Sequence, residues 1–404
     1  MLLLVIGTFL FVCFLLFIGA TYLESSKAEY PPGIANPKLL KSIHTAWTGL
    51  TILGKTLEKL GICSWIVLFR LVINSHKRKL GDDPELLIKN LKFECVPVRI
   101  YQPTAPSAGD RKGVVFLHGG GFMFGSIESY DRICRQISKK SEAVVVSVGY
   151  RLAPEHRCPA AFDDSIKATI HFLKTAKQYG VNPSSVMICG DSAGGILTIT
   201  VCQALVTRTD IPKPLAQVMI YPSSQMIDYT LPSYQQNAMV PVLLKEHTIF
   251  YKLNYLGVNP SMSKEMLSGS HVPPELWKKF SKWLSADIIP DEFKVRGYKP
   301  PVTPTFNHDA YKKLKHALDL TSSPLLAEDA VLSLLPKAYI LTCEYDVLRD
   351  DGILYKKRLE DNGVPVIWHH VKDGFHGIFS FFDTPGCESA KCAMDSVVNF
   401  IKDA

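Results

Sequence analysis

The sequence predicts an α/β fold in which a mostly parallel sheet is covered by helices on both faces. Short apolar runs rich in β-branched residues alternate along the chain with helical stretches of ten or more residues. This alternation is typical of parallel strands that are buried on both sides. With 404 residues, of which 47% are hydrophobic, the chain can bury a large core. The expected strands cover residues 93–100, 114–117, 143–150, 186–189, 217–221, 338–343 and 366–371.

The first 23 residues precede this pattern and contain no charged side chain. As a helix they would be roughly 35 Å long, enough to cross a hydrocarbon core of about 30 Å. A cleaved signal peptide is the alternative, but the run is long, follows no basic residues and lacks a clear small-residue cleavage site. We therefore expect residues 1–23 to be a membrane-spanning signal-anchor. The lysines that follow it, Lys27, Lys38 and Lys41, would favour a cytosolic position for the rest of the chain.

The remaining chain divides into a helical segment and a main domain. Residues 24–92 are expected to form an amphipathic helical segment that belongs to a cap. Its apolar run over 62–73 is interrupted by Arg70 and is too short to span a bilayer. The main domain is expected over 93–404, with a helical cap inserted at about 223–335, where no strand is evident.

Composition argues against several classes of binding protein. The formal net charge of +7 is scattered, and its densest basic run, residues 75–79, is not interleaved with aromatic residues, so we expect no nucleic-acid binding. The ten cysteines form no Cys-x-x-Cys pair, so neither a zinc site nor a disulfide scaffold is indicated, and their pairing stays open. No glycosylation acceptor occurs, because Asn182 and Asn259 are each followed by proline.

The segment Gly190-Asp191-Ser192-Ala193-Gly194 is a Gly-x-Ser-x-Gly motif between an expected strand and an expected helix. Its two glycines allow a sharp turn in which the serine hydroxyl projects above the sheet. Such a pentapeptide also arises by chance, but its position directly after a buried strand makes Ser192 a candidate nucleophile. The neighbouring Asp191 is expected to be structural.

A second cluster of glycines follows another central strand. We call His118-Gly119-Gly120-Gly121 the glycine loop. Its backbone N–H groups are uncovered by side chains, and with the N–H of Ala193 they would form an oxyanion hole. A phosphate-binding loop is the alternative, but neither Gly-Lys-Ser/Thr nor Gly-x-Gly-x-x-Gly follows.

A serine hydroxyl needs a neighbouring base to become a nucleophile, and in this class of fold the order along the chain is serine, acid, histidine. His376 lies in a glycine-flanked loop just beyond the last expected strand, which is the required position. His369 and His370 lie inside that strand and are expected to have packing or surface roles. The histidines of the cap region, expected to be surface residues, are His247, His271, His308 and His316.

Asp346 is the expected acid, because it follows the strand at 338–343 and precedes His376 by one helix and one strand. Glu344 is the rival, but the alternation of side chains along a strand can turn it to the wrong face. Asp350 and Asp351 begin the next helix, where the helix dipole stabilises carboxylates and suffices to explain them.

These motifs resemble the hormone-sensitive-lipase branch of the α/β-hydrolases. The resemblance rests on HGGGF, GDSAGG, YRLAPEHRCPAAFDD (150–164), EYDVLRDD and DGFHG. Within that branch, the N-terminal apolar run, LEKLGICS, DDPELL, VPPELWKKFSKWLS and YKKRLEDNGV resemble the arylacetamide deacetylase-like proteins. The resemblance covers nearly the whole chain.

The resemblance implies an α/β-hydrolase fold and a serine esterase or amidase that acts on small apolar esters, or on aryl or lipid amides, without cofactor or metal. It assigns the nucleophile, the orienting acid and the general base to Ser192, Asp346 and His376, and the oxyanion region to the glycine loop and Ala193. It also implies an anchor in the endoplasmic reticulum with a lumenal catalytic domain, opposite to the lysine bias. A catalytically inactive relative and a lipase of stored triacylglycerol or cholesteryl esters remain alternatives.

Two large side chains directly after the glycine loop bear on substrate choice. Phe122 and Met123 are expected to face the acyl pocket. Substitutions there would alter which substrates fit.

Overall fold

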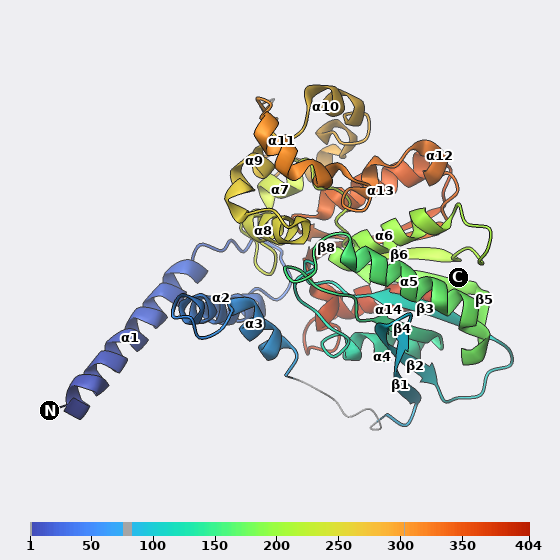
Figure 1. Cartoon of the computed structure of the whole chain (residues 1–404), viewed down its shortest axis with the longest axis horizontal. Coiled ribbons are helices and arrows are strands. Elements are labelled where there is room, and N and C mark those ends of the chain that lie inside the picture. Colours follow the sequence, from blue (N-terminus) through green and yellow to red (C-terminus); the bar gives the residue numbers. More distant parts are fainter. Residues whose placement is uncertain (1, 76–82, 303) are drawn as a thin grey trace.

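The computed structural model describes residues 2–75, 83–302 and 304–404 (Figure 1). Its centre is an eight-stranded sheet in the order β1-β2-β4-β3-β5-β6-β7-β8. Strands β3 to β8 run parallel, and β2 pairs antiparallel with both β1 and β4. The strands are β1 (Leu86–Phe93), β2 (Val96–Pro103), β3 (Arg111–Leu117), β4 (Val144–Val148), β5 (Val181–Asp191), β6 (Ala216–Ile220), β7 (Lys337–Tyr345) and β8 (Val366–Phe375).

Helices cover both faces of the sheet, as expected for buried parallel strands. Alternate residues of β3 point to opposite faces: Val114 and Phe116 belong to one core cluster, and Val115 and Leu117 to the other. The first cluster is completed by α4 (Asp131–Ser141) and α14 (Glu388–Asp403), and the second by α5 (Ala160–Thr175), α6 (Ala193–Leu205) and α13 (Arg349–Asp361). The predicted α/β architecture is therefore confirmed.

The prediction of helix up to residue 92 is wrong, because residues 86–93 form strand β1. Its sequence LLIKNLKF alternates buried and exposed side chains over most of its length, as an edge strand does. Glu94 and Cys95 then adopt φ values of 46° and 71°, so the chain reverses in a tight turn into β2. The run that begins at residue 93 is thus divided between two strands of a hairpin.

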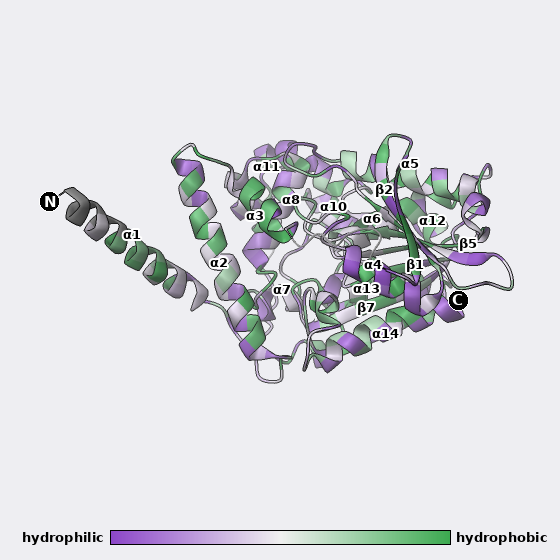
Figure 2. Cartoon of the chain, turned by 90° about the horizontal axis from the view of Figure 1, so that it is seen from below, coloured by the Kyte–Doolittle hydropathy of each residue, from purple (hydrophilic) through white to green (hydrophobic). Residues whose placement is uncertain are grey.

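Three helices precede the sheet: α1 (Leu2–Ser25), α2 (Pro37–Lys59) and α3 (Trp65–Ile73). Figure 1 shows α1 projecting away from the body of the molecule, and Figure 2 shows polar and apolar residues interspersed along α2. The side chains of residues 1–6, 9 and 10 lie outside the described residues. Among the helices that the structure does describe, none combines the length and the hydropathy that a bilayer crossing requires.

Between β6 and β7 the described chain contains helices and turns but no strand. Figure 1 shows most of these short helices gathered on one side of the sheet, above it in that view. They are α7 (Pro232–Gln236), α8 (Lys245–Leu256), α9 (Ser263–Ser268), α10 (Pro274–Phe280), α11 (His308–Leu314) and α12 (Asp329–Leu332).

Arg70 ties α3 to the chain that follows the glycine loop. Its Nε donates to the carbonyl of Met123 at 2.7 Å, and its Nη2 donates to the carbonyl of Ala153 at 2.7 Å. The same guanidinium pairs with both carboxylate oxygens of Glu155, at 2.9 and 3.0 Å. One side chain thus satisfies two main-chain acceptors and one carboxylate, which fixes α3 against the main domain.

Replacing Arg70 by alanine is expected to destabilise the protein by about 2–3 kcal/mol, because two carbonyls lose a charged donor at a partly buried site. The apparent melting temperature of the full chain measures this effect. Arg70→Lys is the matched control: it keeps the charge but cannot donate in three directions from one plane, so it should restore only part of the stability. An alanine variant that melts with the wild type would contradict this role.

Candidate active site

Ser192 lies at the turn between β5 and α6 in a conformation that few non-glycine residues adopt, with φ 53° and ψ −116°. The turn is tight enough to exclude side chains on either side of it. A Cβ on Gly190 would lie 2.3 Å from the carbonyl oxygen of Gly194, and a Cβ on Gly194 would lie 1.9 Å from that of Leu117. The motif therefore uses glycine because backbone atoms already fill the space.

The structure brings Ser192, His376 and Asp346 into one hydrogen-bonded line. Nε2 of His376 lies 2.9 Å from Oγ of Ser192, and its Nδ1 lies 2.8 Å from Oδ2 of Asp346. His376 directly follows β8 and Asp346 directly follows β7, so the carboxyl ends of neighbouring strands deliver both residues. All three side chains are buried, and the other carboxylate oxygen of Asp346 accepts the N–H of Leu348 at 2.8 Å.

The rival acid, Glu344, lies in a separate ionic cluster. Its carboxylate pairs with Arg349 at 3.0 Å, with Arg296 at 2.9 Å and with Nε2 of His370 at 3.3 Å. The side chain of Glu344 thus points away from His376. The side chain of Asn237 links this cluster to the turn that carries Asp346. Its Nδ2 donates to the carbonyls of both Glu344 and Asp346, at 3.0 and 2.9 Å.

The glycine loop contributes fewer free donors than expected. The N–H of Gly119 donates to Oδ1 of Asp191 at 2.8 Å, so it is not available to a ligand. The carboxylate of Asp191 also accepts from the hydroxyl of Tyr130 at 2.9 Å, and burial raises its pKa to about 6. Asp191 therefore fixes the loop in place, and the prediction that Gly119 is an oxyanion donor is wrong.

The side chain of His118 is likewise a supporting group. Its ring stacks on Tyr150 at 4.2 Å, and burial lowers its pKa to about 4, so the imidazole is neutral. The N–H groups of Gly120, Gly121 and Ala193 remain, and none of them makes a hydrogen bond within the described part of the chain. Gly120 and Gly121 have φ values of 110° and 61°, which explains the need for glycine at both positions.

A cavity of about 360 Å³ opens over Ser192 and His376. Gly120, Gly121 and Ala193 line it together with Ser192, so their free N–H groups are the candidate oxyanion donors. Most of the remaining wall is apolar. It comes from α2 and α3, the segment after β3, α6, the cap, and the segments that follow β7 and β8. The principal apolar contributors are Trp47, Phe69, Ile73, Phe122, Phe124, Ile196, Val242, Leu243, Leu348 and Phe381.

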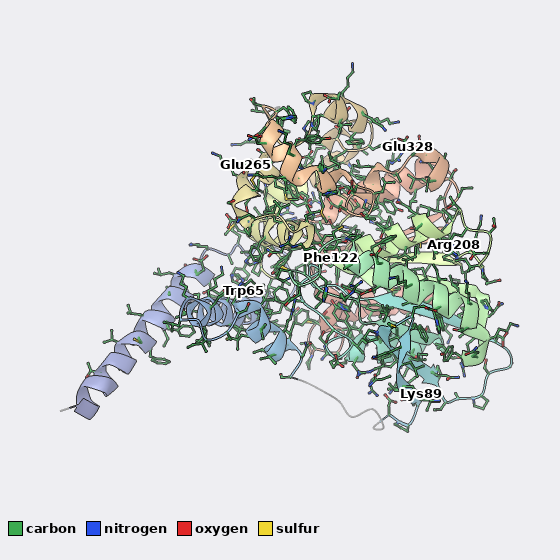
Figure 3. All side chains as sticks on the ribbon, viewed as in Figure 1. Trp65, Lys89, Phe122, Arg208, Glu265 and Glu328 are labelled. Atoms are coloured by element: carbon green, nitrogen blue, oxygen red, sulfur yellow. The ribbon has the colours of Figure 1, made fainter. Side chains whose placement is uncertain are left out.

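The structure places one of the two side chains expected in the acyl pocket elsewhere. Phe122 lines the cavity, and Figure 3 shows it near the centre of the molecule. Met123 is instead packed into a small cluster with Ile66 of α3 and Ala153, and Phe124 takes its place in the cavity wall. Phe122 has a φ of 62°, which redirects the residues after it.

The cap histidines are not all surface residues. His271 is fully buried, and burial lowers its pKa to about 4. Within the described residues no cluster of three His, Cys, Asp or Glu side chains could hold a metal ion. All ten cysteines are free thiols.

Residues 24–92 were expected to belong to a cap, but the sequence singled out none of the residues of α2 and α3 that line the cavity. Trp47, Phe69 and Ile73 lie at least 119 positions before Ser192 in the sequence. The apolar character of their helices was evident, but the place where these helices dock depends on long-range packing that no local motif records.

A family profile described as "alpha/beta hydrolase fold" matches residues 114–278 and 299–380. Arylacetamide deacetylase-like 4 of Homo sapiens is 43% identical over 389 residues, covering 96% of this chain and 95% of that protein. Arylacetamide deacetylase of Bos taurus is 42% identical, covering 75% of this chain and 77% of its own length. Among solved structures, the carboxylesterase EstE1 from a metagenomic library superposes with a TM-score of 0.62 at 26% identity, covering 88% of this chain and 97% of that one.

Proposed function

Since the chain belongs to the α/β-hydrolase family that includes the arylacetamide deacetylases, we propose that it is a serine-dependent carboxylic ester hydrolase. The observation that carries the proposal is the line Ser192–His376–Asp346, which lies beneath an apolar cavity bordered by free backbone N–H groups. Each part of that arrangement meets a separate need of acyl transfer.

The reaction proceeds through an acyl-enzyme. His376 takes the proton of Ser192 as the serine oxygen attacks the substrate carbonyl, and Asp346 fixes the ring tautomer and stabilises the imidazolium. The N–H groups of Gly120, Gly121 and Ala193 hold the negative charge that develops on the carbonyl oxygen. His376 then gives its proton to the leaving alcohol or amine, and a water molecule activated by the same ring releases the acid.

The cavity supports small apolar esters, with aryl or lipid amides as further candidates. Aromatic and aliphatic side chains form most of its wall, and its size suits a small molecule. No cofactor takes part in these steps, because serine, histidine and water supply every bond and proton transfer.

Purified full-length protein should hydrolyse 4-nitrophenyl butyrate and lose that activity when an organophosphate such as paraoxon is added. Mass spectrometry should find one phosphoryl group per chain, on the peptide that contains Ser192. Prior incubation with excess butyrate ester should slow the labelling. A chain that neither turns over the ester nor reacts with the organophosphate would instead be a ligand-binding relative without catalysis.

Membrane attachment through the N-terminal run belongs to the same proposal, with the catalytic domain in the lumen of the endoplasmic reticulum. It is supported by the absence of charge over residues 1–23 and by the outward-facing apolar side chains of α1. Those at least half exposed in the described part are Phe11, Phe14, Leu15, Leu16, Tyr22 and Leu23. Leaving such side chains in water is unfavourable.

Orientation is tested by building a glycosylation acceptor into an exposed loop. The double variant Ala108→Asn/Asp110→Thr creates Asn-Gly-Thr, and lumenal placement predicts an endoglycosidase-sensitive gain in mass in cells. Ala108→Gln/Asp110→Thr lacks the acceptor and serves as the control. Carbonate extraction of membranes tests attachment separately. An acceptor that stays bare, or a chain that carbonate releases, would overturn the respective part of the proposal.

Asn237→Ala is expected to lower kcat by about 10- to 100-fold, because its amide holds the carbonyls on both sides of the turn that carries Asp346. KM for a small ester should change little, since Asn237 does not line the cavity. Asn237→Ser, which keeps one short donor, should recover part of the loss. Equal losses in stability and in both kinetic constants would indicate a purely structural role.

A further inference from the structure

We propose that Lys252 makes this cavity selective for esters whose acyl or alcohol portion carries a carboxylate. The inference rests on the proposed ester hydrolysis and narrows its substrate class. It concerns a polar part of the cavity wall, where α8 of the cap meets the segment after β6.

Lys252 is a buried cation in the wall of the substrate cavity. The residue is 4% exposed, and it shares the cavity with Ser192 and His376. Its Nζ donates to the carbonyl of Gln225 at 2.8 Å and approaches the hydroxyl of Tyr234 at 3.5 Å. Nζ also lies 4.9 Å from the ring centre of Tyr229. The ring centre of Tyr234 lies 5.9 Å away, so these contacts use neutral groups and two aromatic faces.

No carboxylate within the described chain forms an ion pair with this ammonium. Asp351 is the acid of the same buried region, but its oxygens are occupied by Ser223 Oγ at 3.0 Å, the N–H of Ser224 at 3.1 Å and Nε2 of Gln225 at 3.0 Å. An ammonium has three N–H donors, and the described hydrogen bonds of Lys252, to Gln225 and Tyr234, use two of them. Asp351 attracts the ammonium only at longer range, because the hydroxyl of Tyr234 contacts both groups, at 3.5 Å from Nζ and 3.4 Å from the carboxylate. Burying a charge without a direct counter-ion is costly.

The neighbouring side chains suit a polar ligand group. Thr248 lies one helical turn before Lys252, Ser223 lies across from it, and both line the cavity. Most of the rest of the wall, including Phe122 and Leu243, is apolar. A substrate with an apolar body and one carboxylate would therefore bring a direct counter-charge to Lys252, in a site where water cannot screen the attraction.

The pH dependence supplies a second prediction. Burial lowers the pKa of Lys252 to about 8, and Asp351 opposes this effect. The groups that face Lys252 from other elements are Asp351 of α13, Tyr234 of α7 and Tyr229, and burial raises the pKa of each. Lys252 is thus mostly protonated at pH 7 and loses its charge as the pH rises through 8, so the preference for anionic esters should decline over that range.

The experiment compares esters of similar size that differ in charge. Mono-4-nitrophenyl glutarate against 4-nitrophenyl hexanoate places the carboxylate on the acyl side, and 4-acetoxybenzoate against 4-tolyl acetate places it on the alcohol side. The measured quantity is the ratio of kcat/KM, anionic to neutral, for the wild type, Lys252→Met and Lys252→Arg. Methionine keeps the length of the side chain without its charge, and arginine keeps the charge.

In one of the two pairs of esters, Lys252→Met should lower the ratio of kcat/KM at least about tenfold. The kcat/KM of this variant for the neutral ester should change by less than about threefold. Lys252→Arg should keep the wild-type ratio. The pair of esters whose ratio falls shows whether Lys252 binds a carboxylate on the acyl portion or on the alcohol portion. Ratios that are equal in wild type and Lys252→Met for both pairs would overturn the inference while leaving ester hydrolysis intact. If neither neutral ester is hydrolysed by the wild type, the proposed function fails instead. If Lys252→Met does not fold, the wild type alone tests the inference. An anionic-to-neutral ratio of kcat/KM that does not change between pH 7 and 9 would overturn it.

Discussion

Replacing His376 by alanine is expected to lower kcat for a nitrophenyl ester by about 10⁴- to 10⁶-fold. The ring is the only side chain of the described structure within hydrogen-bonding distance of Oγ of Ser192, so no other group can take the proton. KM should change far less, because the apolar wall of the cavity is untouched. Steady-state kinetics at neutral pH measure the effect, and the residual rate should rise with hydroxide concentration once the internal base is gone.

His369 offers a matched control within the same strand. Its Nδ1 approaches Oγ of Ser396 at 3.4 Å, on the side of the sheet away from the serine turn. His369→Ala should therefore retain activity within about twofold of the wild type, as a surface substitution does. A His376→Ala variant that keeps more than one hundredth of the wild-type kcat would rule out His376 as the general base.

The position of the three residues of the proposed triad could be predicted because each follows a strand that local sequence identifies. The apolar runs before Ser192 and Asp346 are nearly continuous, whereas His369 and His370 interrupt the apolar run before His376. Parallel strands end at one edge of the sheet. The topology then brings residues 30 and 184 positions apart into contact. Backbone order and a few motifs were sufficient for this part of the site.

The hydrogen bonds of the expected oxyanion region could not be predicted from the local sequence. Nothing in the sequence distinguishes the N–H of Gly119 from those of its neighbours. In the structure it donates a hydrogen bond to the carboxylate of Asp191, 72 positions later. Likewise, Phe124 lines the cavity in place of the expected Met123 because the positive φ of Phe122 redirects the chain. Donor availability and side-chain direction in a loop are set by partners from other segments, which a motif does not encode.

The hairpin at the edge of the sheet illustrates a different ambiguity. The segment LLIKNLKF mixes apolar and polar residues in an order that fits either an amphipathic helix or an edge strand. The structure resolves it through pairing, since every residue of β1 has a partner in β2. The cap is similar, because the burial of His271 and Lys252 depends on how short helices stack, not on their own composition.

Gly194→Ala is expected to destabilise the protein by at least about 3 kcal/mol and to remove most folded, soluble protein. The added methyl group would lie 1.9 Å from the carbonyl oxygen of Leu117 and 2.8 Å from that of His118. Both are backbone atoms at the end of β3, so no rotamer change relieves the clash, and only a shift of α6 away from the sheet makes room.

Gly109→Ala is the matched control for this substitution, because no atom lies within 4 Å of its added Cβ and its φ is not in the left-handed region. The two variants make the same chemical change, so the difference in their melting temperatures reports the backbone contact alone. Soluble yield and circular dichroism of both proteins complete the comparison. If Gly194→Ala melted within a degree or two of Gly109→Ala, the close approach of α6 to β3 would be wrong, and with it the turn that holds Ser192 in place.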